Sequence, residues 1–235
     1  MVHMKVSVVI PALNEEKYIR YAFDGLRRQS FKEFEVIVAD AGSTDKTREI
    51  AKKYGAKVVI ERRRGIARGR NAGAKVAKGD ILIFLDADTK PSPTLIESYV
   101  KGIKGEVVAA TGPILPLEKT KKSIRWGYKF VSILFVKLAI KIGRPTIVGS
   151  NFAVKRNVFE KVGGFNSNLI TYEDWDLSKR LKKYGKIIYI DDAIVHTSAR
   201  RIFAWGIHGF FNFHVGNMIR YHLFKKPKEE YEPIR

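Results

Sequence analysis

The 235-residue chain contains no cysteine, so a disulfide framework, a thiolate metal site and a cysteine nucleophile are all excluded. It also lacks an uninterrupted apolar run of about 18 residues, the length that a membrane-spanning helix needs. The most apolar stretch, Trp126 to Ile142, is interrupted by Lys129, Lys137 and Lys141. The first apolar run, Val6–Ile10, is too short for a secretory signal. We therefore expect a cytoplasmic protein.

Acidic residues are scarce: 24 Asp and Glu stand against 44 Lys and Arg, which gives a formal net charge of +20. Such a field attracts polyanions, namely nucleic acid, an anionic membrane surface or phosphorylated small molecules. Composition does not choose among these three. Hydrophobic residues make up 45% of the chain, which is typical of a globular domain.

The first 111 residues alternate short apolar runs with longer helical patterns. Runs rich in Val and Ile predict strands at Val6–Ile10, Glu35–Ala39, Lys57–Ile60, Ile81–Leu85 and Val107–Thr111. Helices are predicted between them at Glu15–Gln29, Thr44–Tyr54, Ala67–Ala77 and Pro93–Lys101. This alternation favours an α/β fold with a doubly wound, mostly parallel sheet and helices on both faces. Ligands of such sheets bind beyond the carboxyl ends of the strands.

After Pro116 the pattern changes. An apolar stripe with lysines on the opposing arc comprises Ile124, Tyr128, Val131, Phe135, Leu138 and Ile142. It predicts a helix that either packs on the domain or lies on an anionic membrane surface. Further strands are predicted at Val148–Val154 and Lys186–Ile190, with a helix at Asp176–Tyr184. Residues 201–224 form a predicted basic, aromatic helical segment, and residues 225–235 a flexible tail.

Acidic motifs follow several of these elements. Asp86 and Asp88 come directly after a predicted strand. One or two carboxylates, completed by phosphates and water, are the usual protein ligands of Mg²⁺. Asp40 ends the second strand, where it either accepts hydrogen bonds from a base or a ribose or serves only the turn that follows. Glu173 and Asp174 precede a helix, where a carboxylate can act as a general base or simply favour the helix dipole.

Taken together, these stretches resemble the family 2 glycosyltransferases, which are inverting enzymes with a GT-A fold. The resemblance covers about residues 5 to 200 and rests on motifs that occur in the family's order. These motifs are Val8–Glu16, Asp40–Asp45, Gly65–Gly73, Asp86–Asp88, Gly149–Arg156, Val162–Phe165 and Glu173–Asp174. The resemblance implies a glycosyltransferase domain over residues 1–200. Residues 1–111 would bind the nucleotide sugar and residues 112–200 would form the acceptor side.

The resemblance also implies a role for each matching position. Ala12, Glu15 and Asp40 would line the nucleoside pocket, with Arg68 near the base or the diphosphate. Asp86 would contact the ribose or the metal. These roles place the nucleotide at the carboxyl ends of the first, second and fourth strands, as expected for this fold class.

The same resemblance assigns the metal and the base. Asp88, with Asp86, would hold Mn²⁺ or Mg²⁺ against the two donor phosphates. Asp174 would be the catalytic base, and Glu173 would position it or the acceptor. His196 matches a third metal ligand found in some members, although a lone histidine is also a common structural residue.

The sequence departs from the processive members of the family, which carry a Gln-x-x-Arg-Trp motif after the base. In its place stands the segment from His196 to Arg201, similar to a Ser-x-Arg-Arg segment in a subset of small members. This favours transfer of a single sugar. Arg200 and Arg201 either clamp the diphosphate or an acceptor phosphate, or form a solvated basic turn.

The sequence therefore predicts a metal-dependent, inverting hexosyltransferase that moves a sugar from a nucleoside-diphosphate sugar to a hydroxyl or a phosphate. A lipid-linked acceptor such as a polyprenyl phosphate, met at the inner face of the cell membrane, would explain the basic and apolar surfaces. One alternative is a sugar-phosphate nucleotidyltransferase, but Pro11–Glu16 lacks the glycines of a triphosphate loop. The other is a nucleic-acid-binding module. Acidic clusters at one sheet edge count against it, so we expect no nucleic acid partner.

Overall fold

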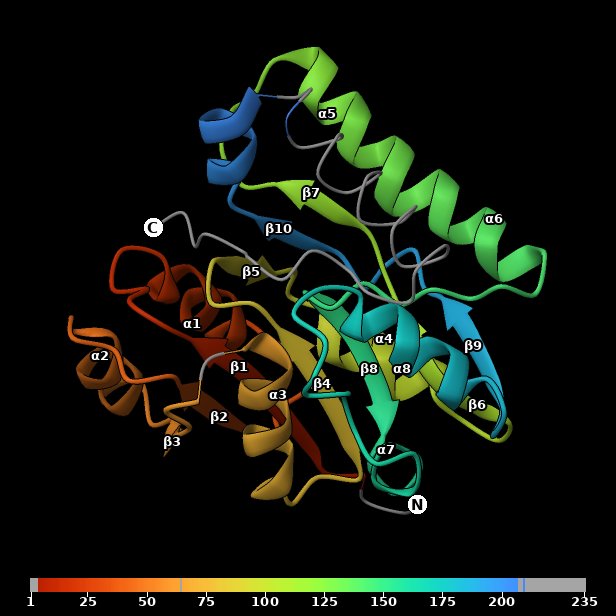
Figure 1. The fold of residues 1–235 in the computed structure, drawn as a ribbon, viewed down its shortest axis with the longest axis horizontal. Coiled ribbons are helices and arrows are strands. Elements are labelled where there is room, and N and C mark those ends of the chain that lie inside the picture. Colours follow the sequence, from red (N-terminus) through yellow and green to blue (C-terminus); the bar gives the residue numbers. More distant parts are fainter. Residues whose placement is uncertain (1–3, 64, 207–208, 210–235) are drawn as a thin grey trace.

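The computed structural model describes residues 4–63, 65–206 and 209. Its centre is a seven-stranded sheet with the order β3-β2-β1-β4-β8-β6-β9 (Figure 1). The strands are β1 Val6–Ala12, β2 Phe34–Asp40, β3 Lys57–Ile60, β4 Ile81–Leu85, β6 Val107–Thr111, β8 Asn151–Lys155 and β9 Lys186–Tyr189. Strand β8 runs antiparallel to β4 and β6, whereas the other pairings are parallel. The predicted mixed, mostly parallel sheet is confirmed.

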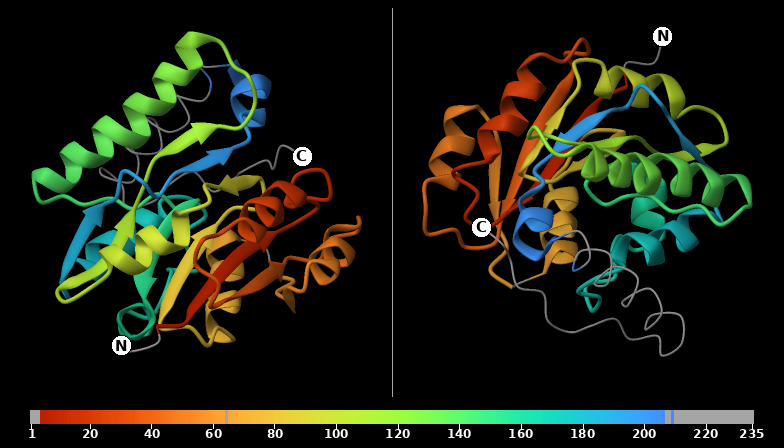
Figure 2. Two further views of the ribbon diagram at one scale, coloured as in Figure 1. Left: turned by 180° about the vertical axis from the view of Figure 1, so that it is seen from behind. Right: turned by 90° about the horizontal axis from the view of Figure 1, so that it is seen from above.

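Helices cover both faces of this sheet (Figure 2). Helices α1, α2 and α4 pack into one apolar cluster, and helices α3, α7 and α8 into a second on the opposite face. Their bounds are α1 Ile19–Arg27, α2 Thr47–Lys53, α3 Ile66–Lys75, α4 Leu95–Gly102, α7 Arg156–Lys161 and α8 Glu173–Leu181. The doubly wound arrangement follows from strand β4, in which every residue is buried because both faces are covered.

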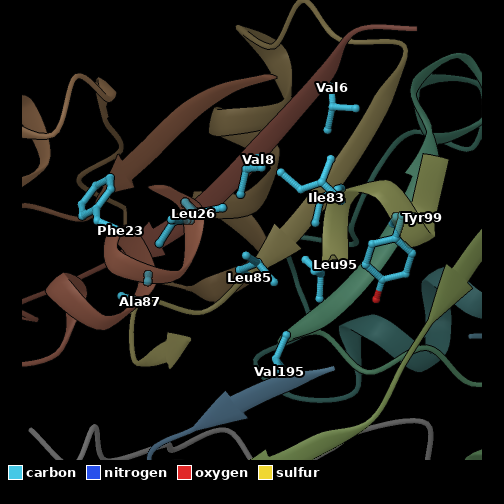
Figure 3. Close-up of a cluster of buried hydrophobic side chains, with 14 of the residues drawn as sticks. Val6, Val8, Phe23, Leu26, Ile83, Leu85, Ala87, Leu95, Tyr99 and Val195 are labelled. Atoms are coloured by element: carbon cyan, nitrogen blue, oxygen red, sulfur yellow. The ribbon is translucent and has the colours of Figure 1, made fainter. Parts of the chain in front are cut away.

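The two apolar clusters hold the strands of the large sheet in position and thereby place the carboxyl ends of β1, β2 and β4. On one face, Val8 of β1 and Ile83 of β4 contact residues of α1 and α4, with Tyr99 closing the cluster (Figure 3). On the other face, Phe84 stacks on Phe152 with ring centres 4.8 Å apart. These contacts hold the carboxyl ends of β1, β2 and β4 at one edge.

A second sheet was not predicted, because its strands are too short for periodicity to reveal them. It has three residues in each strand, β5 Thr89–Pro91, β7 Ile114–Pro116 and β10 Val195–Thr197, in the order β5-β10-β7. Strand β10 runs antiparallel to β5 and parallel to β7. Since β5 directly follows Asp88, this small sheet brings the residues around position 197 to the end of β4.

A helical rod crosses the outside of the small sheet (Figure 1). It consists of α5 Lys122–Lys129, a π-helical turn at Phe130–Phe135 (η1) and α6 Val136–Lys141. Buried Ser132, Val136 and Ala139 face the domain, whereas several apolar side chains are exposed: Trp126, Phe130, Leu134, Phe135, Leu138 and Ile142. The exposed set includes Phe135, Leu138 and Ile142, which form the second half of the predicted apolar stripe. The π-helical turn rotates the following residues about the helix axis, so that Ser132, Val136 and Ala139 contact the domain instead.

Among the described helices, this rod included, none combines the length and apolarity needed to cross a membrane. The predicted tail and most of the predicted segment 201–224 lie outside the described residues. Residues 201–206 of that segment are described, and together with residue 200 they form a short helix.

Candidate active site

The loops after β1 and β2 are interlocked, because the two strands are parallel neighbours. The backbone N–H of Asn14 donates to the Ser43 hydroxyl at 2.9 Å. In return, the backbone N–H of Thr44 donates to the Asn14 side-chain oxygen at 2.8 Å. Asn14 has a φ of 54°, in the left-handed region that asparagine tolerates. Helices α1 and α2 therefore begin at Ile19 and Thr47, later than predicted, since the preceding residues bond across the loops.

Asp40, at the end of β2, is fully buried. Its Oδ1 accepts the backbone N–H groups of Gly42 at 3.0 Å and Ser43 at 2.9 Å, a turn that Gly42 permits with a φ of 93°. Its Oδ2 has no hydrogen-bond partner among the described residues. Ala12 lies beside it as the register partner in β1. A buried, unpaired carboxylate oxygen is costly, and an N–H or O–H of a ligand would satisfy it.

Arg200 bridges two of the predicted acidic residues. Its guanidinium donates to both carboxylate oxygens of Glu15, at 2.6 and 2.9 Å. It also lies 3.1 Å from Oδ2 of Asp88 and 4.6 Å from the centre of the Tyr18 ring. The structure thus brings three predicted site residues together, with Arg200 neutralising the two carboxylates.

The Asp88 carboxyl group is the most strongly perturbed group at the end of β4. Burial raises its pKa to about 6, and the negative charges of Asp86 and Glu15 add to this, whereas Arg200 and Arg201 oppose it. Its Oδ1 accepts a hydrogen bond from the Thr197 hydroxyl at 3.3 Å. Sequence reasoning missed Thr197, because the strand that carries it has only three residues.

His196 is placed away from this cluster. Side chains alternate along a strand, so His196 points to the face of β10 opposite to that of Val195, in the core, and Thr197, on Asp88. Burial lowers the pKa of His196, and the nearby charge of Lys90 lowers it further. In the described part of the chain, no group of three or more His, Asp or Glu residues is arranged to hold a metal ion. The structure therefore does not bring the predicted third ligand to Asp86 and Asp88.

Arg70 connects the two halves of the site and was missed in favour of Arg68. Its guanidinium donates to Asp86 at 3.0 Å and to Glu173 at 2.8 Å, and it lies over the Phe165 ring at 5.3 Å. The side chain is 2% exposed, and the two carboxylates raise the pKa of the guanidinium despite its burial. The end of β4 and the start of α8 thus share one buried cation.

Glu173, which is buried, and Asp174, which is half-buried, are adjacent at the start of α8. Burial raises the pKa of both carboxyl groups, and the charge of Arg70 opposes the increase. Asp174 accepts the backbone N–H groups of Gly149 at 3.2 Å and Trp175 at 2.8 Å. A Cβ on Gly149 would lie 2.7 Å from the Arg70 guanidinium, so a larger residue there would push the guanidinium out of its present position.

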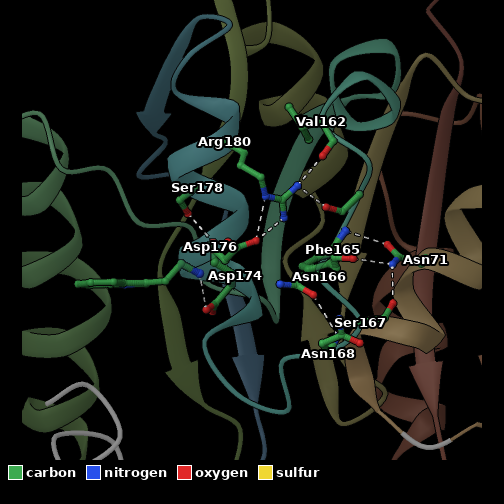
Figure 4. Close-up of polar contacts among 12 residues, drawn as sticks. Asn71, Val162, Phe165, Asn166, Ser167, Asn168, Asp174, Asp176, Ser178 and Arg180 are labelled. Atoms are coloured by element: carbon green, nitrogen blue, oxygen red, sulfur yellow. Dashed lines mark hydrogen bonds and ion pairs between the residues drawn. The ribbon is translucent and has the colours of Figure 1, made fainter. Parts of the chain in front are cut away.

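A second network holds α8 in place (Figure 4). Arg180 donates to the carbonyl oxygens of Val162 and Gly164, both at 2.6 Å, and forms an ion pair with Asp176. Asn71 exchanges hydrogen bonds of 2.8 and 2.9 Å with the backbone of Phe165. Because Asn71 follows Arg70, one turn of α3 anchors both the loop and the carboxylates.

The remaining predicted residues lie apart from these contacts or at their margin. Arg68 is half-buried near Gly65, and its charge acts on Glu61. Arg201 is half-buried, and its charge acts on Asp88. Glu118, which was not predicted, fixes the preceding turn by accepting the Ser198 hydroxyl at 2.6 Å and the Ala199 N–H at 2.8 Å.

Two carboxylates at the end of β4 suit a divalent ion that is completed by phosphates. The negative charge of Asp86 acts on the Asp88 carboxyl group, so the two groups lie within electrostatic reach of one another. Mg²⁺ usually keeps one or two carboxylates and takes its other ligands from phosphates and water. This donor set therefore fits Mn²⁺ or Mg²⁺ once Arg200 releases the Asp88 oxygen that it pairs with.

Comparison with models of known protein families shows to which family the chain belongs. The family model "Glycosyl transferase family 2" matches residues 7–163. The chain belongs to glycosyl transferase family 2. A second model, "N-terminal domain of galactosyltransferase", matches residues 130–197.

Curated relatives of this family 2 member include glycosyltransferase AglE of Haloferax volcanii and probable glycosyltransferase YdaM of Bacillus subtilis. AglE is 29% identical over 189 residues, which is 77% of this chain and 62% of AglE. YdaM is 28% identical over 200 residues, which is 77% of this chain and 47% of YdaM. The chain thus spans about half to three fifths of these relatives.

Solved structures show that the fold is GT-A. Residues 1–349 of Staphylococcus aureus TarS, in complex with UDP-GlcNAc, superpose with a TM-score of 0.67 at 24% identity, over 84% of this chain and 59% of that TarS fragment. The mannosyltransferase PcManGT from Pyrobaculum calidifontis, in complex with GDP-Man and Mn²⁺, gives a TM-score of 0.69 at 21% identity, over 91% of this chain and 64% of that one.

Proposed function

We propose that the protein transfers a single sugar from a nucleoside-diphosphate sugar to an acceptor hydroxyl or phosphate, with inversion of the anomeric carbon. The observation that carries the proposal is the double contact of Arg70, 3.0 Å from Asp86 and 2.8 Å from Glu173. It ties a carboxylate at the donor edge of the sheet to the pair proposed to activate the acceptor. A glycosyltransferase needs these two groups at a fixed separation, because the attack must be in line.

Asp174 is the proposed general base. A base is most effective when its pKa lies near the working pH, and burial moves the pKa of Asp174 upward in that direction. Two backbone N–H groups orient its carboxylate, and Arg70 holds the adjacent Glu173. Asp174 takes the proton of the acceptor hydroxyl while the hydroxyl oxygen attacks the anomeric carbon. The attack comes from the side opposite the leaving diphosphate and therefore inverts the configuration. With a phosphate acceptor, which is already ionised, the pair orients the nucleophile instead.

The donor half of the proposal rests on the ends of β1 and β2. Oδ2 of Asp40, which has no partner among the described residues, would accept a base N–H or a ribose hydroxyl beside Ala12. Glu15 and Arg68 complete the proposed nucleoside pocket. Arg200, paired with Glu15 and Asp88, would exchange these carboxylates for the donor diphosphate, with Arg201 adjacent.

Asp88 and Asp86 are the proposed ligands of Mn²⁺ or Mg²⁺, which when bound would neutralise the charge that develops on the departing diphosphate. The two carboxylates would present oxygen ligands at the end of β4. The Thr197 hydroxyl orients the Asp88 carboxylate, and the Arg70 guanidinium orients that of Asp86.

A lipid-linked acceptor, such as a polyprenyl phosphate, is the proposed partner at the inner face of the cell membrane. The support is the row of exposed apolar side chains on the α5–α6 rod, together with the net charge of +20. Aromatic and basic side chains favour the headgroup region, and basic residues are attracted to anionic lipid.

The test is a panel of UDP- and GDP-sugars, the donor classes named for the TarS and PcManGT structures, with Mn²⁺ or Mg²⁺. We expect at least one donor to raise the melting temperature only when metal is present, and to transfer its sugar to a polyprenyl phosphate. No stabilisation by any donor would overturn the proposal. Pyrophosphate released from a nucleoside triphosphate and a sugar phosphate would instead identify a nucleotidyltransferase.

A further inference from the structure

A cavity lies outside the donor site, between the small sheet and helix α5. Its volume is about 510 Å³, and its polar lining consists of Glu118, Lys119, Thr120, Arg125, Lys129 and His196. A volume of this size accommodates a phosphate group together with part of the molecule that carries it. The established features of the site leave this cavity without a role.

The cavity opens on the face of β10 opposite to Asp88. Thr197 points toward Asp88 and Val195 is buried in the core, so His196, between them, faces the other side. Leu115 of β7, the register partner of His196, lines the same cavity. A ligand bound here would therefore not compete with the nucleotide sugar.

The charge of the lining favours an anion. Lys119, Arg125 and Lys129 are exposed, and no ion pair joins them to another described residue. The single acid, Glu118, already accepts hydrogen bonds from the Ser198 hydroxyl and the Ala199 N–H. The Thr120 hydroxyl is buried and lacks a partner among the described residues. Three cations and a free hydroxyl suit the oxygens of a phosphate.

An exposed apolar ridge begins beside the cavity. Arg125 and Lys129 line the cavity, and the residues that follow each of them, Trp126 and Phe130, are 73% and 58% exposed. The ridge continues along the rod through Leu134, Leu138 and Ile142, which are also exposed. Exposed apolar surface of this extent marks an interaction site. Cations next to it match a molecule that is anionic at one end and apolar at the other.

We propose that the cavity binds the phosphate of an anionic membrane lipid while the ridge enters the acyl-chain region. The inference rests on the proposed function, since a lipid-linked acceptor requires the enzyme to meet a membrane. A soluble phosphate would use the cavity but not the ridge, and a second copy of the chain would cover the ridge but is itself basic. A phosphate-headed lipid uses both features.

The test is co-sedimentation of the full chain with vesicles of phosphatidylcholine alone or mixed with phosphatidylglycerol. The cavity variant is Arg125→Gln/Lys129→Gln. Its matched control is Lys52→Gln/Lys53→Gln on α2, which removes the same charge from two exposed positions. The ridge variant is Trp126→Gln/Phe130→Gln. Circular dichroism and the melting temperature of each variant, compared with those of the unchanged protein, verify that it is folded.

We expect the cavity variant to bind anionic vesicles about 30-fold more weakly, and the control to lose about twofold or less. The ridge variant should lose binding even at low salt. Equal losses in cavity variant and control would overturn the proposal, because net charge alone would then explain binding. Release of the protein by millimolar inorganic phosphate at constant ionic strength would assign the cavity to a soluble phosphate.

Failure of this inference is separable from failure of the proposed function. If vesicle binding is unaffected by the cavity variant while donor stabilisation persists, only the lipid site is wrong. If vesicle binding follows the expected pattern but no nucleotide sugar stabilises the protein, the docking site stands and the transferase proposal falls. A dimer in solution that dissociates in the ridge variant would overturn the lipid assignment in favour of a second copy.

Discussion

The guanidinium of Arg70 lies 2.8 Å from the Glu173 carboxylate, although 103 positions separate the two residues in the chain. Its other end is 3.0 Å from Asp86. Glu173 begins α8, on the acceptor side, whereas Asp86 follows β4, at the donor edge. The ion pair therefore sets the distance between the two groups of carboxylates on which the proposed chemistry depends.

Arg70→Met should destabilise the protein by about 3 to 5 kcal/mol, because it leaves the buried Glu173 and the half-buried Asp86 without their shared cation. Urea unfolding followed by circular dichroism measures the change. Arg68→Met on the same helix is the control, and we expect a change within about 0.5 kcal/mol because Arg68 bridges no buried acid among the described residues. Similar losses in both variants would refute a special role for Arg70.

The choice between these two arginines illustrates what the sequence could predict. Ala67, Arg70 and Ala74 are spaced like one face of a helix, and all three are buried, whereas Arg68 lies off that face. Helical periodicity alone could therefore have identified Arg70 as the inward-facing arginine. Its partners could not be foreseen, because Glu173 reaches it through tertiary packing.

Longer elements were predicted best. The main strands of the first half agree with the structure, because their Val- and Ile-rich runs leave a continuous apolar signal. The starts of α1 and α2 were misplaced, since Asn14 and Ser43 bond across two loops that only the fold brings together. The three-residue strand β10 left no periodic signal at all. The position of Thr197 on Asp88 therefore needed the structure.

Asp174→Asn should lower kcat by about a thousandfold while the affinity for the nucleotide sugar stays within about twofold, because a general base acts only as the acceptor attacks. The asparagine keeps the shape of the side chain and can still accept the Gly149 N–H. Calorimetry of donor binding beside initial rates separates the two effects. Should donor affinity fall in parallel with the rate, Asp174 would be a binding residue.

The rate with a hydroxyl acceptor should increase with pH. The midpoint of this rising limb of the pH–rate profile should lie at a higher pH than the pKa of ordinary carboxyl groups. Burial raises the pKa of Glu173 to about 7 and also raises the pKa of Asp174. The pair therefore loses its last proton at a higher pH than ordinary carboxyl groups do. Arg70 lowers both pKa values, and Arg70→Lys, which holds its charge less closely, should move the limb to higher pH. A limb near pH 4.5 in both proteins would contradict this assignment.

The same shift makes a prediction about stability. A raised pKa in the folded state means that the folded protein binds more protons than the unfolded chain between pH 4.5, the ordinary value for Glu173, and about 7. The contribution is fully present below that window and is lost as the pH rises through it. Glu173→Gln, which cannot ionise, should therefore show a smaller decrease in unfolding free energy between these pH values.

Asp88→Ala should abolish transfer and Mn²⁺-dependent donor binding while the fold survives. The fold survives because Arg200 keeps its two contacts with Glu15 after Asp88 is removed. Donor titrations with and without chelator measure the effect. Asp24→Ala on α1, whose carboxylate contacts the Tyr54 hydroxyl, is the control and should retain metal-dependent binding. Near-normal activity of Asp88→Ala in chelator would show that the metal assignment is wrong.

Thr197→Val and His196→Ala test which residue of β10 supports the metal site. The Thr197 hydroxyl donates to Asp88 at 3.3 Å, whereas His196 faces the cavity on the other side of the strand. Loss of the hydroxyl, at nearly constant volume, should weaken Mn²⁺-dependent donor binding about fivefold, as expected for one modest hydrogen bond. His196→Ala should change it by less than about twofold, because an alternating strand cannot present both side chains to one ion. A tenfold or greater loss in His196→Ala alone would mean that β10 rearranges when the donor binds and that His196 becomes the third ligand.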